Sequence, residues 1–136
     1  MTLFVDTSAL YAAVDAGDRN HEQATAVLAS GEPLVTSDHV LVEGWLLIRG
    51  RLSRRVADEF WAGLRAAVSV ESVGPADLEV AWMIGQEWMD QDFSIVDRTS
   101  FAVMQRLGIL RAATYDDDFA VFRFGRDRTR AFELVR

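Results

Sequence analysis

The sequence contains no cysteine and no lysine, and only two prolines and two histidines among its 136 residues. Without cysteine there can be no disulfide and no thiolate ligand, so a bound metal would have to be held by oxygen atoms or histidine. No apolar run is long enough to span a bilayer, and no basic N-terminal region precedes an apolar segment. These absences predict a cytoplasmic protein that does not enter a membrane.

Positive charge is also scarce. The formal net charge is -7, and all 14 basic residues are arginines. This balance argues against a generic basic nucleic-acid binder. Acidic side chains that converge on a divalent cation would have part of their charge neutralised, however, and arginine is well suited to bidentate contacts with phosphate.

Short apolar runs alternate with helical patterns along the chain. The length predicts one domain covering residues 1–136. Strands are expected at residues 2–5, 33–36, 68–73, 110–114 and 131–135. Helices are expected after an N-cap at Thr7 or Ser8, over 21–30, over 39–48 with Ser37 or Asp38 as N-cap, after the N-cap Ser53, from Pro75, and over 101–107. Residues 119–124 are undecided between helix and loop. This alternation predicts a three-layer α/β/α sandwich with a mainly parallel central sheet.

Two of the predicted strands end in carboxylates. Asp6 follows the apolar run Leu3–Val5, and Asp116, Asp117 and Asp118 follow the run that ends at Thr114. Open parallel sheets keep their functional sites at the carboxyl ends of the strands. We therefore expect these acids to meet at one edge of the sheet and to bind a divalent metal.

Two further acids stand out in helical segments. Glu43 has Val40, Leu46 and Leu47 as helical neighbours, and a carboxylate there is costly unless it is paired or binds a cation. A partly exposed acid on a mostly buried helix is the alternative. Asp97 is well placed as an N-cap, which alone would explain it.

In this order, the motifs resemble the PIN-domain ribonucleases, in particular the VapC toxins of bacterial type II toxin–antitoxin pairs. The resemblance covers essentially the whole chain and is carried by Asp6–Leu10, Val42–Glu43, Ser94–Phe101 and Ala113–Phe119. It implies that the four acidic positions of the family are Asp6, Glu43, Asp97 and Asp116, that Asp118 is a more variable fifth, and that Ser8, Thr99 and Thr114 support the site through hydrogen bonds. Asp117 is expected to be solvated, although a one-residue shift would change which of the three aspartates is the ligand.

The resemblance also implies the chemistry, which is hydrolysis of an RNA phosphodiester bond by in-line attack of water. Mg²⁺ and Mn²⁺ prefer carboxylate and water oxygens, and such ions activate water and stabilise developing charge. Asp6 and Asp97 are expected to be direct or water-mediated ligands. Glu43 and Asp116 would complete the cluster, and one of them would orient the attacking water.

The expected partners are an RNA substrate, a second copy of the chain and a VapB-like antitoxin. Phosphate contacts are assigned as a hypothesis to the arginines near the end of the Glu43 helix, which are Arg49, Arg51, Arg54 and Arg55. The arginines near the C-terminus are a second candidate. Trp45, Trp61 and Trp82 are candidates for partner surfaces, with burial in the core as the alternative.

Two other functions compete with this interpretation. The first is a PIN-like module that binds a partner without cutting RNA. The second is a Mg²⁺-dependent receiver or phosphatase that forms an aspartyl phosphate. The second is disfavoured because the phosphatase needs an aspartate where this chain has Ser8, and the receiver needs a lysine, which this chain lacks.

Overall fold

The computed structural model describes the whole chain, Met1–Arg136. It contains five strands and seven helices, in the order β1 (Leu3–Val5), α1 (Thr7–Val14), α2 (His21–Leu28), β2 (Leu34–Ser37), α3 (Asp38–Arg51), α4 (Arg54–Ala67), β3 (Ser69–Glu71), α5 (Pro75–Glu87), α6 (Ile95–Leu107), β4 (Arg111–Ala113), α7 (Asp118–Val121) and β5 (Glu133–Val135). The alternation of strands and helices is as predicted. The undecided segment 119–124 contributes the single-turn helix α7.

The five strands form one sheet in the order β3-β2-β1-β4-β5, and every neighbouring pair is parallel. The predicted mainly parallel sheet is therefore confirmed and is in fact entirely parallel. Strand β1 lies in the middle, with Phe4 paired to Val35 on one side and to Ala112 on the other. Chain order reverses between β1 and β4, which is the place where open α/β sheets form their binding crevice.

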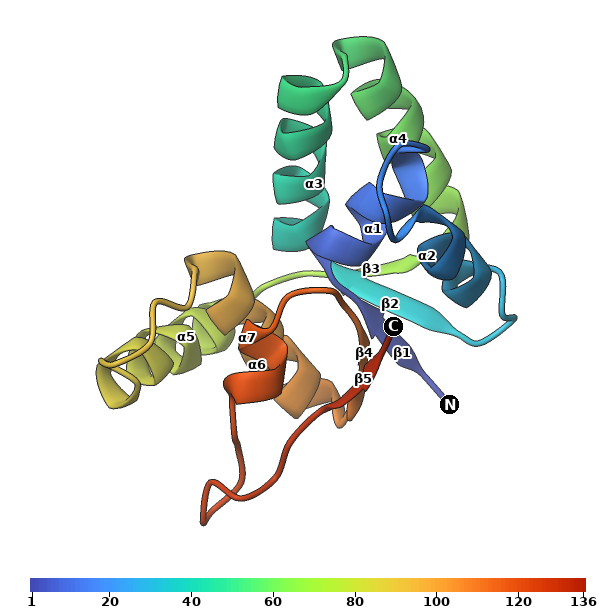
Figure 1. Ribbon diagram of the computed structural model, residues 1–136. Helices are drawn as coiled ribbons and strands as arrows, with labels where there is room; N and C mark the ends of the chain where they lie inside the picture. Colours follow the sequence, from blue (N-terminus) through green and yellow to red (C-terminus); the bar gives the residue numbers. More distant parts are fainter.

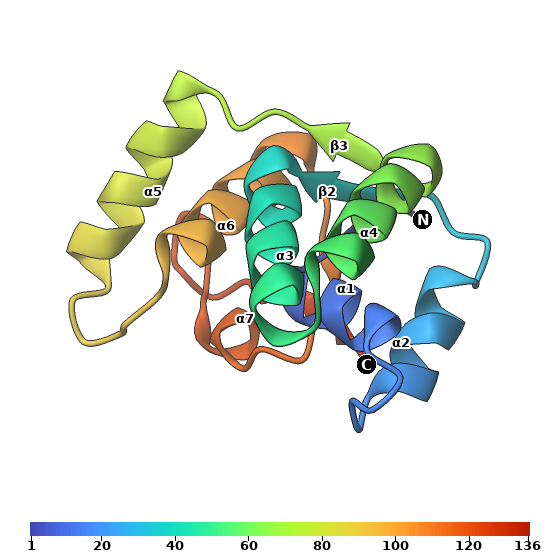
Figure 2. The same ribbon diagram turned by 90° about the horizontal axis from the view of Figure 1, so that it is seen from above.

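Helices flank this sheet, as the predicted three-layer architecture requires. In Figure 1, α3 and α4 lie above the sheet, while α5 and α6 lie to its lower left. Seen from above in Figure 2, α3 and α4 run side by side, α6 lies next to α3, and α5 packs against α6 at the edge of the molecule. None of the helices combines the length and the apolar character needed to cross a bilayer.

The core joins the sheet to the α6 side through aromatic packing. Phe101 of α6 stacks on Phe122 with 4.3 Å between ring centroids and forms a T-shaped pair with Phe119 at 4.9 Å. All three side chains are at most 3% exposed. Such pairs add about 0.5–1.5 kcal/mol each beyond the burial of their area, so α6 and the segment after β4 are fixed relative to each other.

The helix caps agree with the sequence at two positions and differ at two others. Ser37 and Ser53 cap α3 and α4 as expected. Helix α1 begins at Thr7, so Asp6 occupies the N-cap position assigned to Thr7 or Ser8. Asp97 is also not the N-cap of α6: Ser94 holds that position, and its Oγ accepts a 3.1 Å hydrogen bond from the backbone N–H of Asp97. Asp97 therefore lies in the first helical turn, where its side chain is free of capping.

Candidate metal centre

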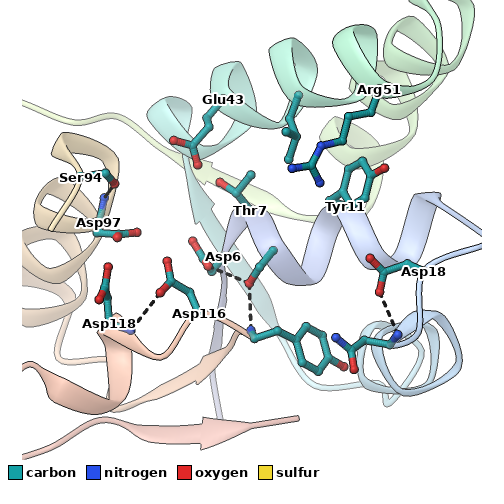
Figure 3. A pocket seen from close by; sticks show the side chains of 14 residues that line it. Asp6, Thr7, Tyr11, Asp18, Glu43, Arg51, Ser94, Asp97, Asp116 and Asp118 are labelled. Carbon is teal, nitrogen blue, oxygen red and sulfur yellow. Dashed lines mark hydrogen bonds between the residues drawn. The ribbon is translucent and has the colours of Figure 1, made fainter. Parts of the chain in front are cut away.

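A cleft of about 460 Å³ opens at the carboxyl end of the sheet, around the ends of β1 and β4. The end of β1 supplies Asp6, the turn after β4 supplies Asp116 and Asp118, and α3 and α6 supply Glu43 and Asp97 (Figure 3). The complete lining consists of Asp6, Thr7, Ser8, Tyr11, Asp18, Asn20, Glu43, Leu47, Arg51, Ser94, Asp97, Tyr115, Asp116 and Asp118. The five acids expected at the site therefore face one cleft.

Asp6 is held in place by hydroxyl groups from two elements. Ser8 Oγ and Thr114 Oγ1 both donate to Asp6 Oδ2, at 3.0 and 2.9 Å. The same hydroxyls accept from backbone N–H groups, Ser8 from Tyr115 at 2.8 Å and Thr114 from Asp116 at 3.0 Å. This network ties the end of β1 to the turn after β4. Asp6 is 2% exposed, and this burial raises its pKa to about 6 although the two hydroxyl bonds favour the ionised form.

Three further carboxylates crowd together opposite Asp6. One oxygen of each of Asp97, Asp116 and Asp118 can be chosen so that all three lie within 4.8 Å of one another. Burial, followed by the negative charges of Asp116, Asp6 and Asp118, raises the pKa of Asp97 to about 8. Burial and the charge of Asp116 also raise the pKa of Asp118. The cluster therefore retains protons near neutral pH unless a cation balances its charge.

The donor set fits a hard divalent cation. The cleft offers carboxylate and hydroxyl oxygens and contains neither histidine nor cysteine, which suits Mg²⁺ or Mn²⁺ rather than softer metals. One oxygen of each of the three crowded carboxylates lies within 4.8 Å of the others, so a single such cation could contact all three. In addition, the buried hydroxyl of Thr7, which lines the cleft beside Asp6, has no hydrogen-bond partner in the protein. A metal-bound water or a substrate oxygen would satisfy it.

Two of the acidic and hydroxyl residues named from the sequence do not contact the acidic cluster. Asp117 points away from the cleft and pairs with Arg136 at 3.0 Å, with 85% of its side chain exposed. It is thus solvated, as expected. Thr99 is buried, but its hydroxyl donates to the carbonyl of Val96 at 3.0 Å and lies 3.2 Å from His39 Nδ1. Its hydroxyl bonds no carboxylate, because it faces the packing of α6 against α3 rather than the cleft.

The four arginines proposed for phosphate contacts lie in different surroundings. Arg51 lines the cleft, whereas Arg49 lies over the ring of Trp45. Arg54 and Arg55 belong to α4 and pair with Asp58 and Glu59 on its exposed surface, at 3.4 and 3.8 Å. The structure therefore places one of these four guanidinium groups beside the acids.

Several lining residues were not singled out from the sequence: Thr7, Tyr11, Asp18, Asn20, Leu47, Ser94 and Tyr115. A spacing of four residues would have identified part of this set. Glu43, Leu47 and Arg51 follow one another at this interval along α3, and residues four apart in a helix share a face. The contributions of Asp18 and Asn20 depend on how the segment between α1 and α2 folds back, and no periodic signal predicts that.

Comparison with known proteins gives a consistent result. The model of the PIN domain family matches residues 3–125. The chain is 43% identical over 129 residues to VapC20 of Mycobacterium tuberculosis, a 23S rRNA-specific endonuclease, covering 90% of this chain and 95% of that protein. The crystal structure of M. tuberculosis VapC20, described as a sarcin–ricin loop cleaving toxin, superposes with a TM-score of 0.82 and 39% identity over 88% of this chain and 93% of that one.

More distant structures share the fold. VapBC2 from Rickettsia felis, solved with a DNA fragment from its promoter, gives a TM-score of 0.69 at 10% identity, over 89% of this chain and 92% of that one. FitAcB from Neisseria gonorrhoeae gives 0.63 at 14% identity, over 86% and 88%. At these identities the likeness concerns the backbone arrangement alone.

Proposed function

The chain belongs to the PIN-domain family, and from this premise we propose that it is a Mg²⁺- or Mn²⁺-dependent endoribonuclease, the toxin of a VapBC-type pair. The observation that carries the proposal is the convergence of Asp6, Glu43, Asp97, Asp116 and Asp118 on one cleft at the carboxyl end of the sheet. We treat residues 1–136 as a single catalytic domain. Cytoplasmic RNA is the substrate class, and 43% identity to a 23S rRNA-specific endonuclease favours 23S rRNA.

Each acid has a role in this proposal. Asp6 and Asp97 hold the ion, directly or through water, while Glu43 and Asp116 complete the negative cluster and one of them orients the attacking water. Asp118 supports Asp97. When bound, the ion supplies Lewis-acid activation of water and stabilises charge on the phosphate. The bonds from Ser8 and Thr114 to Asp6 keep its carboxylate in a fixed orientation, so less reorganisation is needed when substrate arrives.

Cleavage of purified bacterial ribosomes tests the proposal. The wild-type protein should cut 23S rRNA with Mg²⁺ or Mn²⁺ and should stop when EDTA is added. Asp6→Asn and Asp97→Asn should abolish cleavage while the circular dichroism spectrum stays native. Asp117→Asn is the matched control, because Asp117 is next to the cluster in sequence but outside the cleft. Binding of rRNA without metal-dependent cleavage would instead favour the non-cutting module.

The same family membership supports a VapB-like antitoxin and a homodimer as partners. Trp45 and Trp61 line a second, apolar cleft of about 430 Å³ between α3 and α4, where Trp45 Nε1 donates to Asp58. Trp82 on α5 is 62% exposed. Both regions offer aromatic anchors of the kind that partners bury. Light scattering of the protein alone, and after co-expression with the product of its neighbouring gene, tests both partners.

A further inference from the structure

The half of the cleft that lies away from Asp97 and Asp118 has a different chemistry. In Figure 3, Arg51 reaches from the end of α3 toward Tyr11 of α1, on the far side of Asp6 from Asp97 and Asp118. Arg51 is the one basic side chain in a lining that contains six carboxylates. A single guanidinium is thus placed in the same cavity as the acidic cluster, but at its other end.

The Arg51 side chain is held beside Tyr11 and forms no ion pair, although its charge also acts on the Tyr11 hydroxyl and on nearby Asp15. Its guanidinium carbon lies 5.1 Å from the centroid of the Tyr11 ring, a cation–π contact. Tyr11 is itself 7% exposed and its hydroxyl donates to Asp15 Oδ2 at 2.7 Å, so the ring is a fixed platform. None of the ion pairs in the structure involves Arg51.

This arrangement suits a phosphate group. A guanidinium presents five planar donors that match the oxygens of a phosphate, and the contact with Tyr11 can occupy only part of them. An RNA strand that brings one phosphate to the acidic cluster carries another on each side of it, along a cleft whose volume lies within the usual 300–1,000 Å³ of ligand sites. Tyr115 also lines the cleft and offers a second aromatic surface to a sugar or base.

We propose that Arg51, supported by the ring of Tyr11, binds the backbone phosphate adjacent to the scissile one, so that this half of the cleft is a nucleotide subsite. The inference rests on the proposed ribonuclease function and assigns to Arg51 the placement of the strand. The Arg51 contact also explains how a protein of net charge -7 holds an RNA strand, because the attraction between Arg51 and a phosphate adds to that of the bound cation.

Arg51→Ala is the decisive variant, and it should fold normally because Arg51 is exposed. We expect kcat/KM for cleavage of 23S rRNA to fall about 10- to 100-fold, mainly through KM, as for loss of a hydrogen bond to a charged group. The slope of log binding constant against log salt should become shallower by about 0.7, measured on a short single-stranded RNA with Ca²⁺ in place of Mg²⁺. Arg51→Lys should recover part of the loss, because charge remains while the planar donors are gone.

Arg65→Ala is the matched control, since Arg65 is an exposed arginine in the last turn of the neighbouring helix α4 and lies outside the cleft. It should change kcat/KM and the salt slope by less than about twofold, because surface charges contribute little. If the wild type cuts RNA and Arg51→Ala behaves like Arg65→Ala, the subsite is wrong while the nuclease stands. If the wild type cuts no RNA but Arg51→Ala still weakens RNA binding, the nuclease is wrong while the phosphate contact stands.

Discussion

At the scale of single residues, Asp97 and Asp118 show what the acidic cluster does to its own members. Their carboxylates lie close together with that of Asp116, and the pKa values of both Asp97 and Asp118 are raised by burial and by neighbouring negative charge. The cation-free protein therefore stores unfavourable electrostatic energy whenever these groups ionise.

The first prediction follows from the pKa of Asp97, which is about 8 when folded against 3.8 as an isolated side chain. Between these pH values Asp97 keeps its proton in the folded state and has lost it in the unfolded state. The free energy of unfolding therefore decreases as pH rises from about 4 to 8. Asparagine cannot ionise. In EDTA, Asp97→Asn should therefore have a free energy of unfolding at least about 2 kcal/mol above that of wild type at pH 8.5, out of the roughly 5–6 kcal/mol to which the full shift corresponds, and nearly equal to it at pH 4. Urea unfolding at the two pH values measures this.

The control for this prediction is Asp117→Asn, which removes an exposed carboxylate next to the cluster. Its stability should follow the pH dependence of the wild type. Parallel pH curves for wild type and Asp97→Asn would show that Asp97 carries no trapped proton.

The second prediction separates the three consecutive aspartates. Sequence spacing alone does not decide which of them are ligands, because a shift of one residue satisfies the motif equally well. Asp116 and Asp118 face the cleft, whereas Asp117 faces Arg136. Asp118→Asn should lower metal-dependent cleavage at least about tenfold, the usual cost of disturbing a group that supports a metal ligand. Asp117→Asn should cut at the wild-type rate, and a loss confined to Asp117→Asn would reverse the assignment.

At the scale of elements, the contact between α3 and α4 depends on a glycine. A Cβ at Gly44 would lie 2.9 Å from Cζ of Phe60, a ring that is 8% exposed in the core. Gly63, in α4, has no atom within 4 Å of the corresponding position. The two glycines therefore occupy helices that pack together but differ in the space around them.

The third prediction uses this difference. Gly44→Ala should destabilise the protein by about 1–3 kcal/mol, because the Phe60 ring must move within a packed core. Gly63→Ala should stabilise it by about 0.5–1 kcal/mol, because alanine loses less backbone entropy in a helix and meets no obstacle. Thermal unfolding of both variants gives the comparison. Equal effects would mean that Phe60 relaxes freely and that α3 and α4 are loosely packed.

The elements also show where sequence reasoning succeeds and fails. The location of the acids after β1 and β4 can be predicted from local sequence. A carboxylate that directly follows a buried parallel strand lies at the carboxyl end of the sheet, where the binding crevice forms. The type and position of Asp97 predict an N-cap, but Ser94 holds that position, because the start of the helix depends on packing beyond the local sequence. The family resemblance implies that Thr99 supports the site, but the orientation of its hydroxyl depends on how α6 meets His39 of α3.

At the scale of the whole molecule, the site joins segments from almost the entire chain. Asp6 follows β1, Glu43 lies in α3, Asp97 in α6 and Asp116 precedes α7, so these acids approach one another only when the sheet and both helix layers are assembled. The unfolded chain has no such cluster. A cation that binds it must therefore bind the folded state far more strongly than the unfolded state, and binding is linked to global stability.

The fourth prediction is a metal-dependent rise in melting temperature. Mn²⁺ at about 100 times its dissociation constant adds about 2.7 kcal/mol, which for a chain of this size raises Tm by about 5–10 °C relative to EDTA. At one fixed Mn²⁺ concentration, the rise should be larger at pH 8 than at pH 5.5, because protons retained by Asp6 and Asp97 compete with the metal and raise its dissociation constant. Asp97→Asn should lose most of the rise while keeping its higher stability in EDTA. An equal rise in that variant would mean that the ion binds elsewhere on this acidic protein. A cation attracted only by the net negative charge would stabilise wild type and Asp97→Asn to the same extent.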